Sequence, residues 1–97
     1  MKKGYWVAVY RSIADQWSLK AYAALALPAV EAFGGRFLTR PTSQVEPYEA
    51  GLPLRTIVVE FDSYETAVAA RHSEAYTKAL RALGFRALRD FRIVEGA

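Results

Sequence analysis

The sequence contains no cysteine and only one histidine. The lack of cysteine excludes disulfide bonds, thiolate nucleophiles, cysteine-based zinc sites and iron–sulfur clusters. With a single histidine and scattered carboxylates, no His-x-x-His-like spacing brings several metal ligands onto one helix face. We therefore expect the chain to hold neither a metal ion nor another cofactor.

Long apolar runs are also missing from the sequence. No segment approaches the length of about 20 residues that a membrane-spanning helix needs. The two lysines near the N-terminus are followed by an alternating segment that is too short and too polar for the apolar part of a signal peptide. A cytoplasmic protein is the expectation from these two absences.

The excess of one charge sign is small. Thirteen Lys and Arg residues against ten Asp and Glu residues give a formal net charge of +3. The basic residues are densest near the C-terminus, at Lys78, Arg81, Arg86, Arg89 and Arg92. Because such a pattern is typical of a solvated helix face and strand edge, we favour that interpretation over a binding site for a polyanion.

Apolar residues, in contrast, are abundant. Hydrophobic residues make up 53% of the 97 positions and aromatic residues 13%. A domain of about 100 residues buries roughly two-thirds of its unfolded surface. The chain therefore predicts a single domain over residues 1–97 with more apolar surface than one copy readily covers, which favours an oligomer.

The periodicity of apolar residues predicts four strands and two helical regions. The first helix is capped by Asp15 and ends at Gly34-Gly35, and Pro28 is expected to bend it or to divide it into two pieces. Asp62 or Ser63 caps the second helical region, which is expected to break at His72-Ser73-Glu74 and to end at Gly84. The predicted strands are 4–11, 36–40, 55–61 and 90–94, with an irregular loop at 42–53.

This order of elements, strand, helix, strand, strand, helix, strand, is the pattern of the ferredoxin-like α+β fold with an antiparallel four-stranded sheet. Both helical regions are expected to cover one face of the sheet. The other face must meet something, and Trp6, Ala8, Leu38 and Val58 are interpreted as strand residues too apolar to face water. A second copy of the chain is the expected cover.

The sequence resembles the DUF1330 family, a domain of unknown function related to the dimeric α+β barrels. The resemblance covers nearly the whole chain, but two segments depart from the family pattern: Pro41-Thr42 replaces a glycine pair, and Glu74-Ala75 alters the segment before Tyr76. It implies a two-sheet barrel closed by two subunits and no established chemistry. The segments that carry it are Gly4-Tyr5-Trp6, Lys20-Ala21-Tyr22, Phe33-Gly34-Gly35-Arg36-Phe37-Leu38, Val58-Val59-Glu60-Phe61, Ser63-Tyr64-Glu65-Thr66-Ala67 and His72-Ser73-Glu74-Ala75-Tyr76.

His72 is the candidate proton carrier, because histidine is the side chain whose ordinary pKa lies nearest neutral pH. A lone histidine at a helix break is more often a packed or capping residue than a base, so that interpretation is favoured. Ser73 lacks the partners that a nucleophilic serine needs. Tyr22 and Tyr76 lie at core spacing in their helices, and we expect both to pack and to border a pocket between the sheet and the helices.

Arg40 and Glu60 complete the predicted pocket residues. Glu60 lies between two apolar residues of the third strand, so it faces away from both and needs a cation if that face is buried. Arg40 is expected on the face of the second strand that also carries Arg36 and Leu38, where it pairs with Glu60 or binds the carboxylate of a small molecule. We favour the pairing.

RNA binding is the less favoured alternative. RNA-recognition domains share this strand order and place aromatic side chains on their two central strands. Aligning Phe61 with the last aromatic residue of that motif puts Thr56 and Val58 where stacking rings are needed. Trp6 and Tyr10 on the first strand are interpreted as interface residues instead.

These observations favour a homodimeric protein that binds a small organic molecule, or a cofactor-independent enzyme of the barrel type. A non-catalytic assembly or regulatory module, which needs no pocket, remains the alternative from a different class. Both hypotheses rest on fold resemblance, which does not define a reaction.

Overall fold

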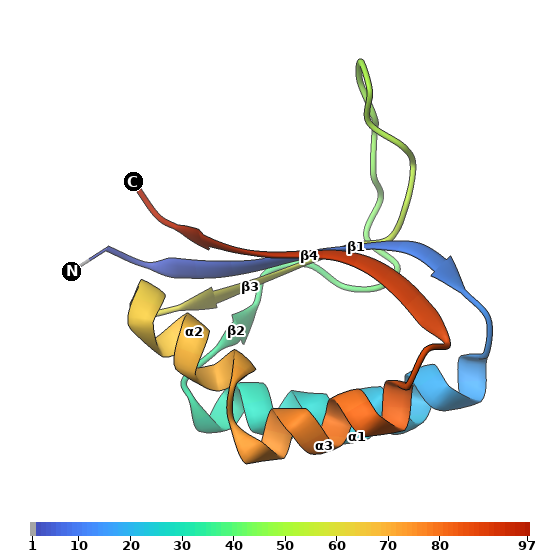
Figure 1. Cartoon of the computed structure of the whole chain (residues 1–97). Helices are drawn as coiled ribbons and strands as arrows, with labels where there is room; N and C mark the ends of the chain where they lie inside the picture. The colour runs from blue at the N-terminus through green and yellow to red at the C-terminus, as the bar shows by residue number, and fades with distance from the viewer. Residues whose placement is uncertain (1) are drawn as a thin grey trace.

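The computed structural model describes residues 2–97, which form a four-stranded sheet and three helices. The second helical region is divided at Ser73, as the sequence predicts, and both pieces cover the same side of the sheet (Figure 1). In chain order the elements are β1 (Gly4–Ile13), α1 (Gln16–Ala32), β2 (Arg36–Phe37), β3 (Thr56–Phe61), α2 (Tyr64–Arg71), α3 (Glu74–Leu83) and β4 (Ala87–Glu95).

The strands form one antiparallel sheet in the order β2-β3-β1-β4. All three helices lie on one side of this sheet, and the other side, called the open face below, is covered by no helix of residues 2–97 (Figure 1). The predicted ferredoxin-like α+β architecture is therefore confirmed.

The two edge strands differ in length from the prediction. β4 is longer than 90–94 because β1 continues to Ile13 and keeps pairing with it beyond an irregularity between Tyr10 and Ser12. β2 is shorter than 36–40. After Phe37 the Thr39 hydroxyl bonds the backbone of β3, and the backbone N–H of Arg40 turns towards the Ser43 hydroxyl.

The two faces of β1 alternate as the sequence predicts, but one assignment was wrong. Trp6 and Ala8 lie beneath the helices at 3% and 4% exposure, whereas Leu38 and Val58 belong to the open face. Trp6 is held on the helix side because its indole N–H donates to the carbonyl oxygen of Ala67 in α2 at 2.8 Å. Alternation places these residues on opposite faces and does not show which face the helices cover.

The side chains that cap the helix starts are among those that the sequence predicts. The Asp15 carboxylate accepts from the backbone N–H of Trp17 at the start of α1, and the Ser73 hydroxyl caps α3. Of the two candidates for α2, the cap is Ser63, whose hydroxyl accepts from the backbone N–H of Thr66. Asp62 instead contacts a side chain of β2.

The end of α1 depends on two glycines with different tasks. The helix runs without interruption through Pro28, so the alternative of two separate pieces was wrong. Gly34 has φ of +74°, which is the predicted left-handed exit. Gly35 allows a close approach, since an added Cβ would lie 2.5 Å from Val30 and 2.8 Å from Phe61.

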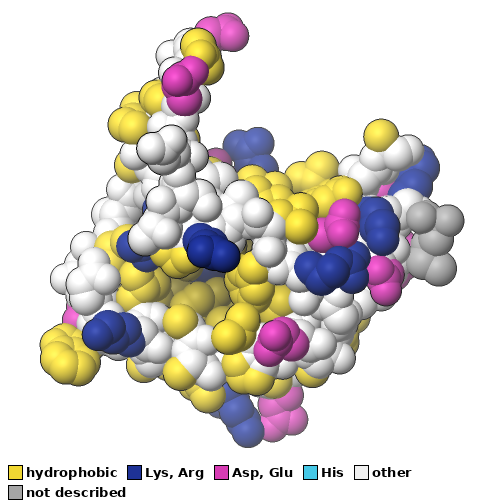
Figure 2. All heavy atoms as spheres, turned by 180° about the vertical axis from the view of Figure 1, so that it is seen from behind, with side chains coloured by type: hydrophobic (Ala, Val, Ile, Leu, Met, Phe, Trp, Pro, Cys, Tyr) yellow, Lys and Arg dark blue, Asp and Glu magenta, His cyan; other side chains and the backbone are white. Residues whose placement is uncertain are grey.

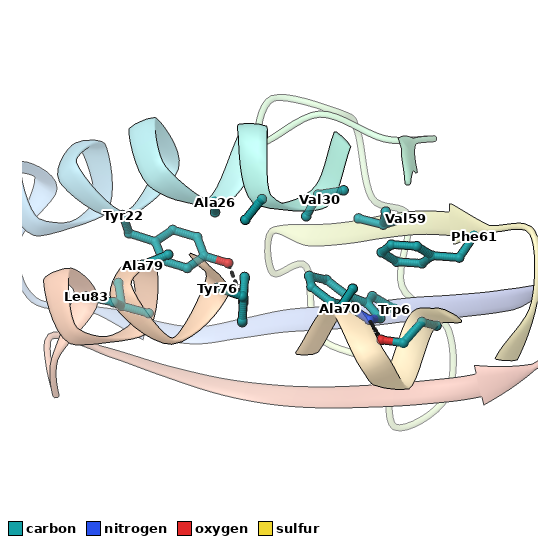
Figure 3. Packing of buried hydrophobic residues seen from close by; sticks show 12 residues of the cluster. Trp6, Tyr22, Ala26, Val30, Val59, Phe61, Ala70, Tyr76, Ala79 and Leu83 are labelled. Carbon is teal, nitrogen blue, oxygen red and sulfur yellow. Dashed lines mark hydrogen bonds between the residues drawn. The ribbon is translucent and has the colours of Figure 1, made fainter. Parts of the chain in front are cut away.

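The core lies between the helices and the sheet (Figure 3). Its largest fully buried side chains include Phe61 and Tyr76, and the ring of Trp6 packs against both at centroid distances of 5.1 and 4.8 Å. Aromatic pairs at these separations stabilise a core beyond the area that they bury.

Residues 41–54, called the arm below, form the longest irregular connection and extend away from the sheet on the side opposite the helices (Figure 1). The predicted loop at 42–53 is thereby confirmed. The arm carries apolar side chains in the open: Tyr48 is 71% exposed and Leu52 57%.

Candidate functional site

A cavity of about 340 Å³ lies between the sheet and α1. Its walls come from β1, β3 and β4 on one side and from α1 on the other, and Phe37 and residues 39–41 border it. Figure 2 shows this face of the molecule, where hydrophobic side chains line a hollow with Lys or Arg side chains along its upper border. The sequence predicts a pocket between sheet and helices, and the cavity lies in that position.

The hollow exists because alanines face each other across it. Ala8 projects from β1, and Ala23 and Ala26 project from α1. In the sheet, Ala8 pairs with Ile57 and Phe91, which also line the cavity. Protein interiors have few voids larger than a water molecule, so a hollow bounded by small residues on two facing elements is a specific feature of this sequence.

Tyr22 and Arg89 supply polar groups to the cavity wall. The Tyr22 hydroxyl lies 2.6 Å from the Tyr76 hydroxyl (Figure 3), and the Arg89 guanidinium donates to the two hydroxyls at 3.1 and 3.4 Å. Burial, and next the neighbouring Tyr76 hydroxyl, raises the pKa of Tyr22. The phenol therefore stays protonated at neutral pH and can donate a hydrogen bond.

Two of the predicted pocket residues, Tyr22 and Arg40, line the cavity. Tyr76 does not reach the wall: it is fully buried and lies behind Tyr22, where it bonds that hydroxyl. The structure thus brings Tyr22 and Tyr76 together, while Arg40 borders the same cavity from the connection after β2.

Glu60 lies elsewhere, on the open face. Its carboxylate is 2.9 Å from the Arg36 guanidinium and accepts from the Tyr5 hydroxyl at 3.0 Å, and these two bonds, Arg36 first, lower the pKa of Glu60. The predicted ion pair therefore forms with Arg36, and the predicted partner Arg40 was wrong. Because β2 ends at Phe37, Arg40 does not continue the alternation that was expected to carry it to Glu60.

His72 also lies away from the cavity. It is the exposed residue that ends α2, and its backbone N–H bonds the carbonyl oxygen of Val68. His72 therefore caps the C-terminus of α2, which agrees with the alternative that the sequence predicts to a role in proton transfer. A chemical role for His72 stays a prediction.

Arg89, Arg55 and Tyr10 were missed as cavity residues. Arg89 had been grouped with the solvated basic residues near the C-terminus, yet its side chain points into the cavity. The signal was present in the alternation of β4, because Arg89 shares its face with Phe91 and Ile93. Tyr10 had been interpreted as an interface residue, which was wrong, since it is 7% exposed beneath the helices.

The placement of aromatic residues disfavours RNA recognition on the open face. Trp6 and Tyr10 face the helices, so they cannot stack on bases there. Thr56 and Val58 occupy the open face of β3, and Tyr5 is the one aromatic residue that β1 and β3 present on it within residues 2–97. Its hydroxyl is engaged with Glu60.

Within residues 2–97 the structure contains neither a cluster of metal ligands nor a membrane-spanning helix. No group of three or more His, Cys, Asp or Glu side chains comes together in a way that could hold a metal ion. Across the same residues, no helix combines the length and apolarity required to span a bilayer. The absence of metal and cofactor stays a prediction.

Solved structures with low sequence identity share this fold. Methylated RPA0582 protein has a TM-score of 0.75 and 14% identity, covering 99% of this chain and 82% of its own. A second structure of RPA0582, a protein of unknown function from Rhodopseudomonas palustris, has a TM-score of 0.69 and 18% identity, and the match covers 97% of this chain and 80% of that one. An ethyl tert-butyl ether D (EthD) family protein, BH0200, from Bacillus halodurans C-125 has a TM-score of 0.59 and 12% identity, and the match covers all of both chains.

None of the curated proteins matches the sequence at a significant level. A family model does match, and it spans residues 3–97, which is nearly the whole chain. The resemblance described from the sequence segments is thereby confirmed. The chain belongs to DUF1330, a domain of unknown function.

Proposed function

We propose that the protein binds a small organic molecule in the cavity between the sheet and α1. The observation that carries the proposal is an apolar cavity of about 340 Å³ in a chain of only 97 residues. Ligand pockets are typically apolar hollows of roughly 300–1,000 Å³ with a few polar groups that orient the ligand. Tyr22 and Arg89 are polar groups of that kind.

Binding is supported more directly than turnover. Within residues 2–97, no His, Ser, Asp, Glu or Lys side chain lines the cavity. A nucleophile activated by a neighbouring base therefore has no counterpart in the wall. The polar groups that are present donate hydrogen bonds and carry positive charge, which suits recognition of a ligand.

The proposal is tested by thermal denaturation of the protein against a broad metabolite library. A ligand at one hundred times its dissociation constant stabilises the folded state by about 2.7 kcal/mol, which is readily seen as a shift in melting temperature. The absence of any shift across the library would contradict the proposal and favour the assembly or regulatory module.

Two variants of α1 make the test specific to the cavity. Ala26 is buried and lines the cavity, whereas Ala21 is exposed on the same helix and does not. Ala26→Phe should fill the hollow and remove the stabilisation by ligand, while Ala21→Phe should leave it unchanged. An equal response in both variants would place the bound ligand elsewhere.

We further propose that the chain forms a homodimer through the open face. Apolar side chains occupy the centre of this face on β1 and β3, and ion pairs flank them, Arg36 with Glu60 at the β2 edge and Arg92 with Asp90 at the β4 edge. An apolar centre with a polar rim is the usual anatomy of a protein interface. The arm projects on the same side, so a second subunit seated there would meet it (Figure 1).

Sedimentation velocity tests the dimer with a pair of variants. Val58 lies on the open face of β3, and Leu25 is 43% exposed on α1. We expect the wild type and Leu25→Asp to sediment as dimers and Val58→Asp as a monomer with the helical circular dichroism retained. A wild-type protein that sediments as one chain, at the concentration used for the ligand screen, would refute the assembly.

A further inference from the structure

Among the residues that the structure describes, the arginines of the cavity have no acidic partners. Arg40, Arg55 and Arg89 all line it, and within residues 2–97 no Asp or Glu side chain does. The ion pairs of the described residues involve other cations, such as Arg36 and Arg92 on the open face. Positive charge is therefore gathered at the cavity wall with no carboxylate among the described residues that line it.

Arg89 is the most enclosed of these cations. Its guanidinium carbon lies 5.0 Å from the Tyr22 ring centre, 5.1 Å from that of Phe91 and 5.5 Å from that of Tyr10. One terminal nitrogen of Arg89 donates to the Tyr22 hydroxyl and the other donates to the Tyr76 hydroxyl. Because a guanidinium has five N–H donors, some of them remain available for a ligand. A half-buried cation held only by neutral groups is costly unless an anion joins it.

Arg55 adds a second positive charge to the cavity wall, on the β3 side of Tyr10, whereas Arg89 lies on the β4 side. The guanidinium carbon of Arg55 and that of Arg89 lie 5.6 and 5.5 Å from the centre of one ring, that of Tyr10. A cavity lined by charges of one sign attracts ions of the opposite sign. The two arginines thus give the cavity wall a positive charge that a bound anion would balance.

We propose that the ligand of the cavity is an organic carboxylate with an apolar body, and that its carboxylate is bound by Arg89 with support from Arg55. The inference rests on the proposed binding function and names the chemical class of the ligand. The apolar wall around Ala8 and Ile57 accommodates the body of the molecule. Arginine binds a planar carboxylate through parallel N–H donors, which fixes its orientation.

The test uses matched acid and amide probes: benzoate with benzamide, and octanoate with octanamide. Each pair has the same shape and differs in charge. Since hydrogen bonds to a charged group are stronger than neutral ones, we expect each acid to bind the wild type roughly ten- to one-hundred-fold more tightly than its amide at neutral pH. Calorimetric titration measures both constants.

Arg71 provides a matched control for Arg89. Its guanidinium stacks on Phe91 at 5.2 Å and on Tyr76 at 5.4 Å, but the residue does not line the cavity. Arg89→Met should abolish the preference for the acid, and Arg71→Met should keep it. Arg55→Met should weaken the preference and gives a second reading should Arg89→Met fail to fold, which circular dichroism shows.

The outcomes separate this inference from the binding proposal. Equal binding of acid and amide would overturn the carboxylate assignment and leave the cavity as a ligand site. An acid preference that survives in both Arg89→Met and Arg55→Met would also overturn it, since the charge would then be recognised elsewhere. If no probe binds, the carboxylate assignment fails; the binding proposal fails as well only if the wider library gives no shift.

Discussion

Replacing Ala8 by isoleucine should make the ligand-free protein more stable. Ala8 is 4% exposed and projects from β1 into the cavity, so the larger side chain enters space that is already open. Each buried methylene contributes about 0.8 kcal/mol, and three added carbons therefore set an upper limit of about 2.4 kcal/mol. Allowing for imperfect fit, we expect about 1–2 kcal/mol, or a rise of roughly 4–16 °C in melting temperature.

Ala67→Ile is the matched control for this prediction. Ala67 is also fully buried, but it lies under Trp6 and does not line the cavity. The same enlargement there overpacks the core, so we expect a loss of about 1–3 kcal/mol. Urea denaturation at fixed protein concentration measures both changes. A loss of stability for Ala8→Ile similar to that for Ala67→Ile would refute the reasoning, because the hollow beside Ala8 would then be filled.

Three further changes have expected outcomes. Tyr22→Phe removes the hydroxyl that bonds Tyr76 and Arg89, so it should cost about 1–2 kcal/mol in urea denaturation. Tyr64→Phe, on an exposed side chain, should change stability by less than about 0.5 kcal/mol, and equal effects would show that the Tyr22 hydroxyl contributes nothing. Arg36 and Tyr5 lower the pKa of Glu60, so its stabilising effect is present above the ordinary value of 4.5 and is lost as the pH falls below it. Glu60→Gln should therefore flatten the acid side of the stability profile, and parallel profiles of variant and wild type would contradict this. Because His72 lies away from the cavity, His72→Ala should leave both stability and the ligand-induced shift in melting temperature unchanged, and a lost shift would support the predicted chemical role of His72.

The fold was predictable because its signals are local and repeated. Alternation in β1, the cap at Asp15 and the break before Ser73 are all set by neighbouring residues, and the structure confirms each. The face of β1 that carries Trp6 was harder to assign, because both faces are apolar. Contacts between distant residues, such as the bond from Trp6 to Ala67 in α2, show which face the helices cover, and this bond joins residues 61 positions apart.

The site was predictable only in part, for a related reason. Tyr22 was identified from its helix, yet Arg89 was read as one member of a basic cluster, since composition near the C-terminus outweighed its place in the alternation of β4. Arg40 borders the cavity, but its expected partner was wrong, because the length of β2 depends on a turn in which the backbone N–H of Arg40 bonds the Ser43 hydroxyl. Such a bond follows no periodic pattern.

The two proposed binding surfaces share their central strands. Ala8 of β1 faces the cavity, while its neighbours Val7 and Val9 face the open side, and in β3 Ile57 and Val58 divide in the same way. A subunit seated on the open face would therefore hold the backbone that also forms the cavity wall. If the dimer binds a ligand more tightly than the monomer does, thermodynamic linkage requires the ligand to strengthen the dimer by the same factor. Assembly through the open face can thus change the affinity of the cavity for a ligand, although the partner subunit does not contact the ligand.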